Sequence, residues 1–307
     1  MAVILTVTPN TAWDVTYWVD ELVRHASARV RSIDARAGGK GVNVARVLHA
    51  AGHDVLACGF VGGVTGEQIR AELRSAGLPE AMTPIAGESR KTVTVVDSDA
   101  TVLLEPGPTV TAEEWSALVT GYRRHLADAA VVVLSGSLPP GVPPDGYAEL
   151  GRLAADAGVP VVLDSSGDAL RHGLRGRPAV VKPNSAELAT VASGDPRTAA
   201  AAMREAGAGD VVVSLGADGL LAVTGEGVWR AVAEPVQGNP TGAGDAVVAA
   251  LAVGLATGRP WPERLAEAAA MGGAAVAAPL AGDVDKDTYH RLRAAVSVRK
   301  VEETSCH

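Results

Sequence analysis

The chain of 307 residues is long enough for one large α/β domain or two ordinary ones. Apolar residues make up 47% of it and aromatic residues only 3%, so the core must be built from Ala, Val and Leu, which suits tight packing of helices on a sheet. The net charge of −8 argues against nucleic acid or an anionic membrane as the main partner, and no apolar run reaches the roughly 18 residues of a membrane span.

Strand-like apolar runs alternate with helical stretches along most of the chain. Helical spacing and capping signals predict helices near 41–52, 65–77 and 111–127, and a buried helix after residue 245. Because continuously apolar strands are buried on both faces, the pattern predicts an α/β protein with a mostly parallel sheet covered by helices. The predicted strands are 3–7, 55–62, 130–136, 159–166, 179–184 and 210–216.

Residues 13–37 and 90–105 break this pattern, because they alternate apolar with polar residues and no helix follows them. Both segments predict antiparallel strands that are solvated on one face, and the second carries a turn signal at 97–99. The two segments predict one small sheet that forms a lid over the carboxyl ends of the parallel strands. The main domain would then comprise 1–12, 38–89 and 106–307. The alternative is a pair of ordinary edge hairpins.

The segment Asn239-Pro-Thr-Gly-Ala-Gly-Asp245 runs directly into a long apolar stretch. Its three small residues 242–244 would lie at a helix N-terminus, where unpaired N–H groups and the helix dipole favour an anion. Asp245 would then lie where negative charge develops and could accept a hydroxyl proton while the amides stabilise a transferring phosphoryl group. The alternative is an acidic residue that only complements the helix dipole.

A second glycine-rich segment, GGKG at 38–41, leads through Asn43 into an amphipathic helix. It is not a P-loop, because Gly41 stands where Ser or Thr is required, and it fails the dinucleotide fingerprint, which argues against an NAD-linked oxidoreductase. It predicts a turn with exposed backbone amides, beside which Asn43 can bind a polyhydroxylated ligand as both donor and acceptor. A plain strand-to-helix turn is the alternative.

Together the two segments resemble the signatures of the ribokinase-like (PfkB) carbohydrate kinase family, and further motifs of that family follow in order along almost the whole chain. The resemblance implies a three-layer fold with a small β-sheet lid, and ATP-dependent, Mg²⁺-assisted phosphorylation of a sugar. It implies that the catalytic residues are Asp245, Gly242, Ala243 and Gly244. It implies that the sugar is bound by Asp14, Gly38, Gly39, Lys40, Asn43 and Ser137.

The same resemblance implies a nucleotide site with Mg²⁺ held largely through water by Asn184 and Glu187. The residues support this, because Lys182 ends a buried strand and can neutralise phosphate charge, while Asn184 and Glu187 can present oxygens to a hydrated ion. A solvated lysine and a helix cap with Glu at its third position are the alternatives. The implied ATP-binding residues are Lys182, Asn184, Ser214, Gly216, Gly219 and Gly244.

Within the family, the SGSLPPG motif at 135–141, residues 164–167 and the VKPN motif resemble the branch of 1-phosphofructokinase and tagatose-6-phosphate kinase. Arg90 falls where that branch binds a phosphate, and Arg29 and Arg31, two apart on a predicted strand, could complete the clamp, unless they are only solvated lid charges. Ser27 replaces a lysine of the minor 6-phosphofructokinase. Fructose 1-phosphate is therefore favoured, then tagatose 6-phosphate.

Several functions and partners remain to be considered. A kinase for an unphosphorylated sugar and a non-catalytic sugar-binding regulator remain open, although the intact Asp245 argues against the regulator. Small sheets with apolar faces gain by covering each other, which predicts a homodimer through the lid. Two cysteines, Cys58 and Cys306, without disulfide or metal spacing favour a reducing cytoplasm, and the polar tail after about Arg299 is expected to fray.

Overall fold

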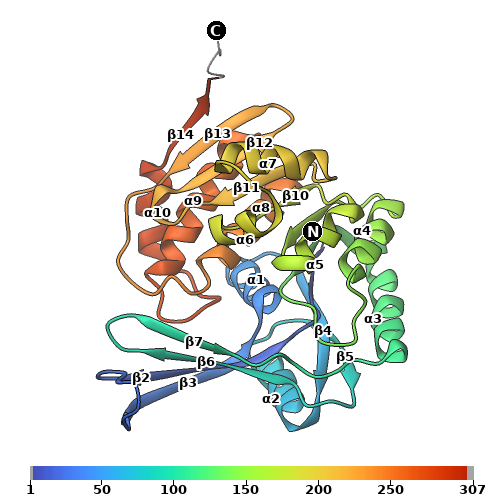
Figure 1. Ribbon diagram of the computed structural model, residues 1–307, viewed down its shortest axis with the longest axis vertical. Helices are drawn as coiled ribbons and strands as arrows, with labels where there is room; N and C mark the ends of the chain where they lie inside the picture. The colour runs from blue at the N-terminus through green and yellow to red at the C-terminus, as the bar shows by residue number, and fades with distance from the viewer. Residues whose placement is uncertain (1–2, 303–307) are drawn as a thin grey trace.

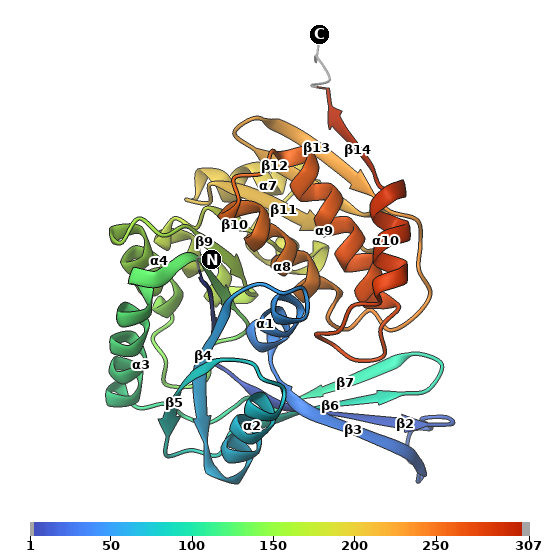
Figure 2. The same ribbon diagram turned by 180° about the vertical axis from the view of Figure 1, so that it is seen from behind.

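The computed structural model describes residues 3–302, and its centre is a ten-stranded sheet with helices on both faces (Figure 1, Figure 2). The strands from β11 to β5 in the order below are parallel, whereas the last three of the chain pair antiparallel at one edge. In spatial order the strands are β14 (Ser297–Val301), β13 (Gly227–Val232), β12 (Leu220–Thr224), β11 (Asp210–Ser214), β10 (Val180–Val181), β9 (Val161–Asp164), β8 (Ala129–Ser135), β1 (Val3–Thr8), β4 (Val55–Gly62) and β5 (Glu80–Ile85).

Two hydrophobic cores, one on each face of this sheet, hold the helices in place. Alternate residues of one strand enter different cores: Val131 and Val133 of β8 face one, and Val132 and Leu134 face the other. The first core packs against α1 (Lys40–Ala50), α2 (Gly63–Ser75), α8 (Ala243–Ala256) and α9 (Trp261–Val276), with α10 (Lys286–Ala295) beside α9. The second packs against α3 (Ala112–His125), α4 (Gly146–Asp156), α5 (Gly167–Gly173), α6 (Ser185–Val191) and α7 (Pro196–Glu205).

A separate four-stranded sheet projects beside the main domain (Figure 1). Its order is β3 (Val30–Gly38), β2 (Ala12–Val19), β6 (Arg90–Val96) and β7 (Ala100–Leu104), so the two segments that alternate in polarity form one sheet and not two edge hairpins. The turn at 97–99 joins β6 to β7. One detail differs from the expectation: β2 and β6 pair in parallel, because each enters the sheet from the same side of the main domain.

The sequence patterns missed the antiparallel edge strands β12 to β14 and the edge strand β5, which carries a proline and polar residues that obscure its pattern. The expected fraying from Arg299 is wrong for Arg299–Val301, which pair with β13. Residues 303–307, including Cys306, lie outside the described part of the chain. Within residues 3–302, no helix is both long and apolar enough to cross a membrane.

Candidate active site

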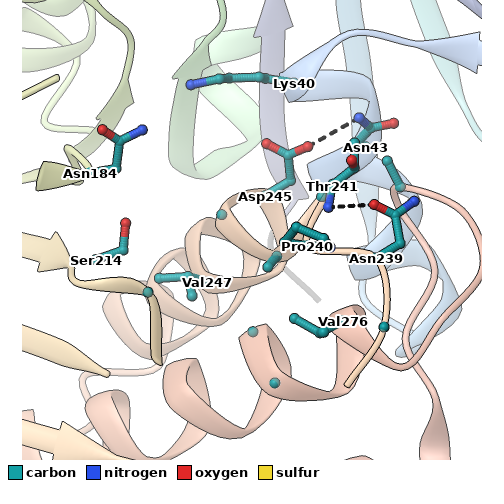
Figure 3. A pocket seen from close by; sticks show the side chains of 18 of the residues that line it. Lys40, Asn43, Asn184, Ser214, Asn239, Pro240, Thr241, Asp245, Val247 and Val276 are labelled. Atoms are coloured by element: carbon teal, nitrogen blue, oxygen red, sulfur yellow. Dashed lines mark hydrogen bonds between the residues drawn. The ribbon is translucent and has the colours of Figure 1, made fainter. Parts of the chain in front are cut away.

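A pocket of about 850 Å³ opens at the carboxyl ends of the parallel strands, between the main domain and the small sheet. Residues from β2, β3 and β6 line one side of it, and the N-terminal ends of α1 and α8 line another. The strand ends contribute Asp164, Lys182 and Ser214. Charged and polar side chains therefore converge from segments that lie far apart in the sequence, at the edge of the sheet where open α/β folds bind ligands (Figure 3).

Asp245 lies in the first turn of α8 and is 6% exposed. The helix begins after Gly242, whose backbone φ of 88° suits glycine and whose added Cβ would come within 2.7 Å of Ala281 Cα. Oδ2 of Asp245 accepts a hydrogen bond of 3.0 Å from Nδ2 of Asn43, which joins the two glycine-rich segments (Figure 3). Oδ1 of Asn43 is buried and has no hydrogen-bond partner among the described residues.

The environment of Asp245 makes it a stronger base than an ordinary aspartate. Burial, together with the negative charge of Asp164, raises the pKa of Asp245 to about 7, although Lys40, the Asn43 hydrogen bond and Lys182 oppose this shift. A carboxyl group with a pKa near neutrality can take up a proton during a reaction and release it again.

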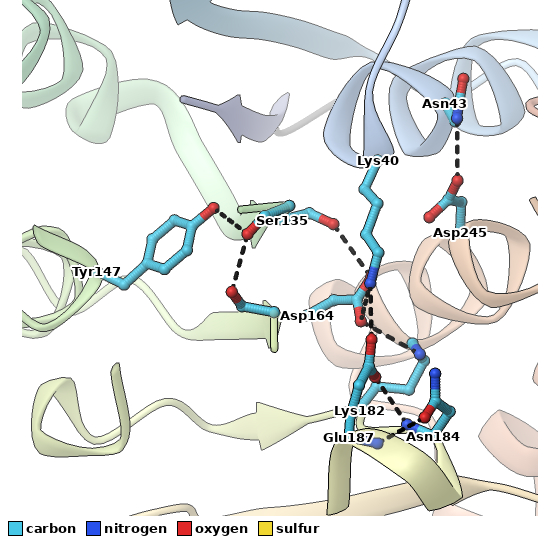
Figure 4. A network of polar contacts seen from close by, with 11 residues as sticks. Lys40, Asn43, Ser135, Tyr147, Asp164, Lys182, Asn184, Glu187 and Asp245 are labelled. Carbon is cyan, nitrogen blue, oxygen red and sulfur yellow. Dashed lines mark hydrogen bonds and ion pairs between the residues drawn. The ribbon is translucent and has the colours of Figure 1, made fainter. Parts of the chain in front are cut away.

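Beside Asp245 lies a network of charges centred on Asp164, which is 1% exposed at the end of β9 (Figure 4). Its Oδ1 pairs with Lys182 Nζ at 3.2 Å and with Lys40 Nζ at 3.5 Å, and its Oδ2 accepts a bond of 3.2 Å from Ser135 Oγ. Lys40 Nζ also reaches Glu187 Oε1 at 3.2 Å. One buried carboxylate thus holds two ammonium groups in place.

The carboxylate of Asp164 and the ammonium group of Lys40 both stay charged in this network. Burial alone would raise the pKa of Asp164, but Lys182, Lys40 and the hydrogen bond from Ser135 lower it below its ordinary value. Burial alone would lower the pKa of Lys40, but Asp164, Glu187 and Asp245 raise it. Lys182 Nζ also lies close to the start of α8, because an added Cβ on Gly244 would be 3.4 Å away. Two cations and the helix N-terminus therefore face the same space, which suits an anionic ligand.

Asn184 and Glu187 form a capping box at the start of α6. Asn184 Oδ1 accepts from the Glu187 N–H at 2.8 Å, and Glu187 Oε2 accepts from the Asn184 N–H at 2.9 Å. The helix-cap alternative therefore describes the local geometry of the pair, and both side chains still line the pocket. Within residues 3–302, no group of three or more His, Cys, Asp or Glu side chains could hold a metal ion directly. The oxygens of Asn184 and Glu187 fit Mg²⁺, because a bound Mg²⁺ retains several waters and takes phosphate oxygens as ligands.

The small sheet contributes a second polar cluster on the opposite side of the pocket. The carboxylate of Asp14 accepts the Gly39 N–H at 3.4 Å and fills the space where a side chain at Gly38 would lie; burial raises its pKa. Arg90 donates to the backbone oxygens of Asn10 and Glu105, each at 3.1 Å, and lines the pocket.

The sequence-predicted residues do not all meet in this pocket. Asp14, Gly39, Lys40, Asn43, Arg90 and the predicted nucleotide and metal residues line it, whereas Gly38, Arg29 and Ser137 do not. The predicted arginine clamp is not assembled within the described chain, because Arg29 is exposed before β3 begins and Arg31 pairs with Asp20 at 3.2 Å. Ser137 instead accepts a bond of 3.0 Å from Asn10 Nδ2.

Two further pocket residues were given no individual role by the sequence. Arg36 lines the pocket and pairs with Asp283 at 3.0 Å, which attaches the small sheet to the loop after α9. In the sequence Arg36 belongs to a basic cluster with Arg29, Arg31 and Lys40, which indicates an anion-binding pocket in an acidic chain but assigns Arg36 no partner. In the sequence Asp164 stands out only as part of the motif at residues 164–167. A carboxylate at the end of a continuously apolar strand also indicates that the carboxylate is buried beside a group of opposite charge.

The remaining part of the pocket is a slot with apolar walls between α8, α9 and the loop before α8 (Figure 3). Val247 and Val276 face it, and small residues keep it open. Ser214, Gly216 and Gly219 also line the pocket. The small residues are Ala269, Gly272, Gly273 and Ala281.

Comparisons with known proteins agree with this geometry. Residues 7–288 match the model of the pfkB family carbohydrate kinases. The structure is similar to phosphofructokinase-2 from Escherichia coli in its tetrameric inhibited form, with a TM-score of 0.87 and 29% identity over 96% of this chain and 99% of that one. It is also similar to a Thermotoga maritima protein described as a "Possible 1-phosphofructokinase", with a TM-score of 0.87 and 28% identity over 98% and 100% of the two chains.

Proposed function

The chain belongs to the pfkB family of carbohydrate kinases, and from that premise we propose that it transfers the γ-phosphoryl group of ATP to a hydroxyl of a hexose phosphate, with fructose 1-phosphate as the preferred acceptor. The observation that carries the proposal is the position of Asp245, a buried carboxyl with a pKa near 7 in the first turn of α8, between the polar cluster of the small sheet and the two lysines. A base is needed where the acceptor hydroxyl meets the phosphoryl group, and the pocket offers one there.

Each part of the pocket has a role in this proposal. Asp245 accepts the hydroxyl proton, and the amides of residues 242–244 at the helix N-terminus bind the transferring phosphoryl oxygens. Lys182 and Lys40 neutralise phosphate charge, and the apolar slot takes the adenine. Asp14 and Asn43 orient the sugar hydroxyls.

Magnesium belongs to the same proposal. Glu187 and Asn184 would hold it largely through water, and the bound ion would neutralise charge on the phosphate oxygens of ATP. The residues of this chain then position the two substrates and exclude water around Asp245.

Fructose 1-phosphate is proposed because the polar cluster of the small sheet holds two guanidinium groups, Arg90 and Arg36, at the pocket wall. Arg36 pairs with Asp283, whereas Arg90 donates to two backbone oxygens, so Arg90 is the guanidinium available to an acceptor phosphate. Similarity to the protein described as a "Possible 1-phosphofructokinase" supports the same choice. The test is ADP release measured with fructose 1-phosphate, tagatose 6-phosphate, fructose 6-phosphate and free hexoses. Highest kcat/KM on a free hexose would reject the sugar-phosphate proposal, and no ADP release on any of them would favour a sugar-binding regulator.

Replacing Arg90 with Ala is expected to raise the KM for fructose 1-phosphate about 10–100-fold, because a charge-assisted contact of about 1.5–3 kcal/mol is lost. The measurement is steady-state kinetics at saturating ATP. Arg90→Lys keeps the charge but loses the planar fork, so its KM should lie between those of the wild type and Arg90→Ala. An unchanged KM in Arg90→Ala would mean that the acceptor phosphate is bound elsewhere or that the acceptor carries none.

A homodimer through the small sheet is also proposed. Seven of the nine large apolar side chains that are exposed among the described residues lie in its two segments: Leu22, Val23, Val30, Ile33, Val102, Leu103 and Leu104. Such a surface is stabilised when a second copy covers it. Light scattering should give a dimer for the wild type and a monomer for the combined Leu103→Glu and Leu104→Glu variant. Arg123→Glu, on α3, is the control for added charge, and a monomeric wild type at micromolar concentration would exclude the proposal.

A further inference from the structure

A second pocket, of about 500 Å³, lies among α1, α8, α9 and α10 and is called the helix pocket below. It shares no lining residue with the candidate active site. Its volume is in the range of small-molecule sites. The floor is apolar because buried residues of α1 and α8 form it, and alanines at several of these positions leave the space open. The floor residues are Val47, Leu48, Ala249, Ala250 and Val253.

The rim of the helix pocket carries more positive than negative charge. Arg259 and Lys286 line it together with two histidines, whereas Glu267 is the single acidic residue among its lining residues. That carboxylate is already engaged, because it accepts a bond of 2.7 Å from Tyr289 Oη and pairs with Arg293 at 3.1 Å. Arg259 is 3.8 Å from the same carboxylate. The histidines are His53 and His290.

Lys286 has no ion-pair partner within residues 3–302. Its neighbours Asp285 and Asp287 do not line the pocket, and Asp285 is occupied in capping α10 through the Thr288 N–H at 2.8 Å. In a chain with a net charge of −8, a cationic rim above an apolar floor is complementary to an anion that carries an apolar group.

We infer that the helix pocket binds a small amphipathic anion, whose carboxylate, phosphate or sulfonate group pairs with Arg259 and Lys286 while its apolar part contacts Ala250 and Val253. No residue of the phosphoryl-transfer site takes part in this binding. The site is therefore distinct from both substrate sites.

The helix pocket is also placed to affect the candidate active site. Its floor residues belong to α1 (Val47 and Leu48) and α8 (Ala249, Ala250 and Val253). The N-terminal ends of the same two helices carry Asn43 and Asp245, which are joined by a hydrogen bond of 3.0 Å. A ligand between the helices changes how they pack, and that change reaches this hydrogen bond through two rigid elements. This coupling rests on the proposed kinase function, whereas the binding itself does not.

Binding is tested with 8-anilinonaphthalene-1-sulfonate, a fluorescent aromatic sulfonate, titrated in the presence and absence of a non-hydrolysable ATP analogue so that dye in the active-site pocket is recognised. Lys286→Glu and Arg259→Glu should each raise the dye's dissociation constant about fivefold, and Ala250→Leu, which fills the floor, should abolish binding. Arg123→Glu, on α3, should leave it unchanged. Octanoate should displace the dye and inorganic phosphate alone should not.

The assignment is overturned if neither charge reversal changes the dissociation constant, or if the ATP analogue removes all bound dye. Because Lys286 is exposed and has no ion-pair partner within residues 3–302, the result for Lys286→Glu stands even if Ala250→Leu fails to fold. The coupling is tested by ADP release with saturating octanoate, which should change kcat at least about twofold in the wild type and leave Lys286→Glu unaffected at the same concentration. Binding without a change in kcat would reject the coupling, and binding by a protein without kinase activity would reject only the proposed function.

Discussion

Asp245→Asn is expected to lower kcat by about 10²–10⁴-fold while ATP binding remains nearly unchanged, because an amide cannot accept the proton of the acceptor hydroxyl. Asn has the same shape and can still accept the bond from Asn43 Nδ2, so the start of α8 should keep its geometry. The measurements are the coupled ADP-release assay for turnover and calorimetry for nucleotide affinity. Turnover close to that of the wild type would show that the base is a different group.

The same variant is expected to be more stable than the wild type at pH 8. The pKa of Asp245 is raised from 3.8 to about 7 in the folded protein, so the folded state binds this proton more tightly than the unfolded chain does. The charged carboxylate therefore destabilises the fold, and this penalty grows as the pH rises from about 4 to 7. Asparagine removes a penalty on the order of 4 kcal/mol, so the Tm should rise by several degrees at pH 8 and change little near pH 4. If Asp245→Asn loses activity while its Tm rises, the loss is due to the missing base and not to a damaged fold.

The pH dependence of the wild type should report the same carboxyl. Because Asp245 must be unprotonated to act as a base, kcat/KM should fall about tenfold per pH unit below pH 7 and level off above it. A profile that stays flat between pH 5.5 and 8 would contradict this role.

The features that sequence alone predicted are local ones. The start of α8 was predictable because a proline, three small residues and an acidic residue precede a long apolar run, and all of these effects act within one helical turn. The small sheet was predictable because its two segments alternate in polarity. Each strand of the parallel sheet from β8 to β11 was visible as a short apolar run, even β10, which has only two residues in the ladder.

The features that sequence missed are pairings between distant segments. Arg36 meets Asp283 across 247 residues, and Lys40 meets Asp164 across 124, so neither charge could be assigned a partner before the fold was known. The sequence also predicted that Arg29 lies within the strand. In the structure β3 begins one residue later, and Arg29 is exposed to solvent. The order of the strands brings Asp164 beside Lys182, and no local sequence pattern predicts that order.

Breaking the buried pair of Asp164 and Lys182 is expected to lower the stability of the protein strongly. Asp164 and Lys182 are 1% and 3% exposed, and their charged atoms are 3.2 Å apart. Asp164→Asn leaves the buried ammonium of Lys182 without its carboxylate, which should cost about 3–5 kcal/mol of the free energy of unfolding, measured by urea denaturation at pH 7. The pKa of Asp164 is lowered in the fold, so its contribution is present above about pH 4 and is lost as the pH falls through that lowered pKa.

The double variant Asp164→Asn with Lys182→Met removes both charges and should be more stable than Asp164→Asn alone, because no buried charge is left uncompensated. The matched control is the exposed pair of Arg171 and Asp168, whose charged atoms are 2.7 Å apart. Asp168→Asn should cost less than about 1 kcal/mol, since solvent screens an exposed pair. Equal costs for Asp164→Asn and Asp168→Asn would mean that water reaches the buried network. In that case Asp164 could not raise the pKa of Asp245 through a medium of low polarity, and the base at the start of α8 would need a different explanation.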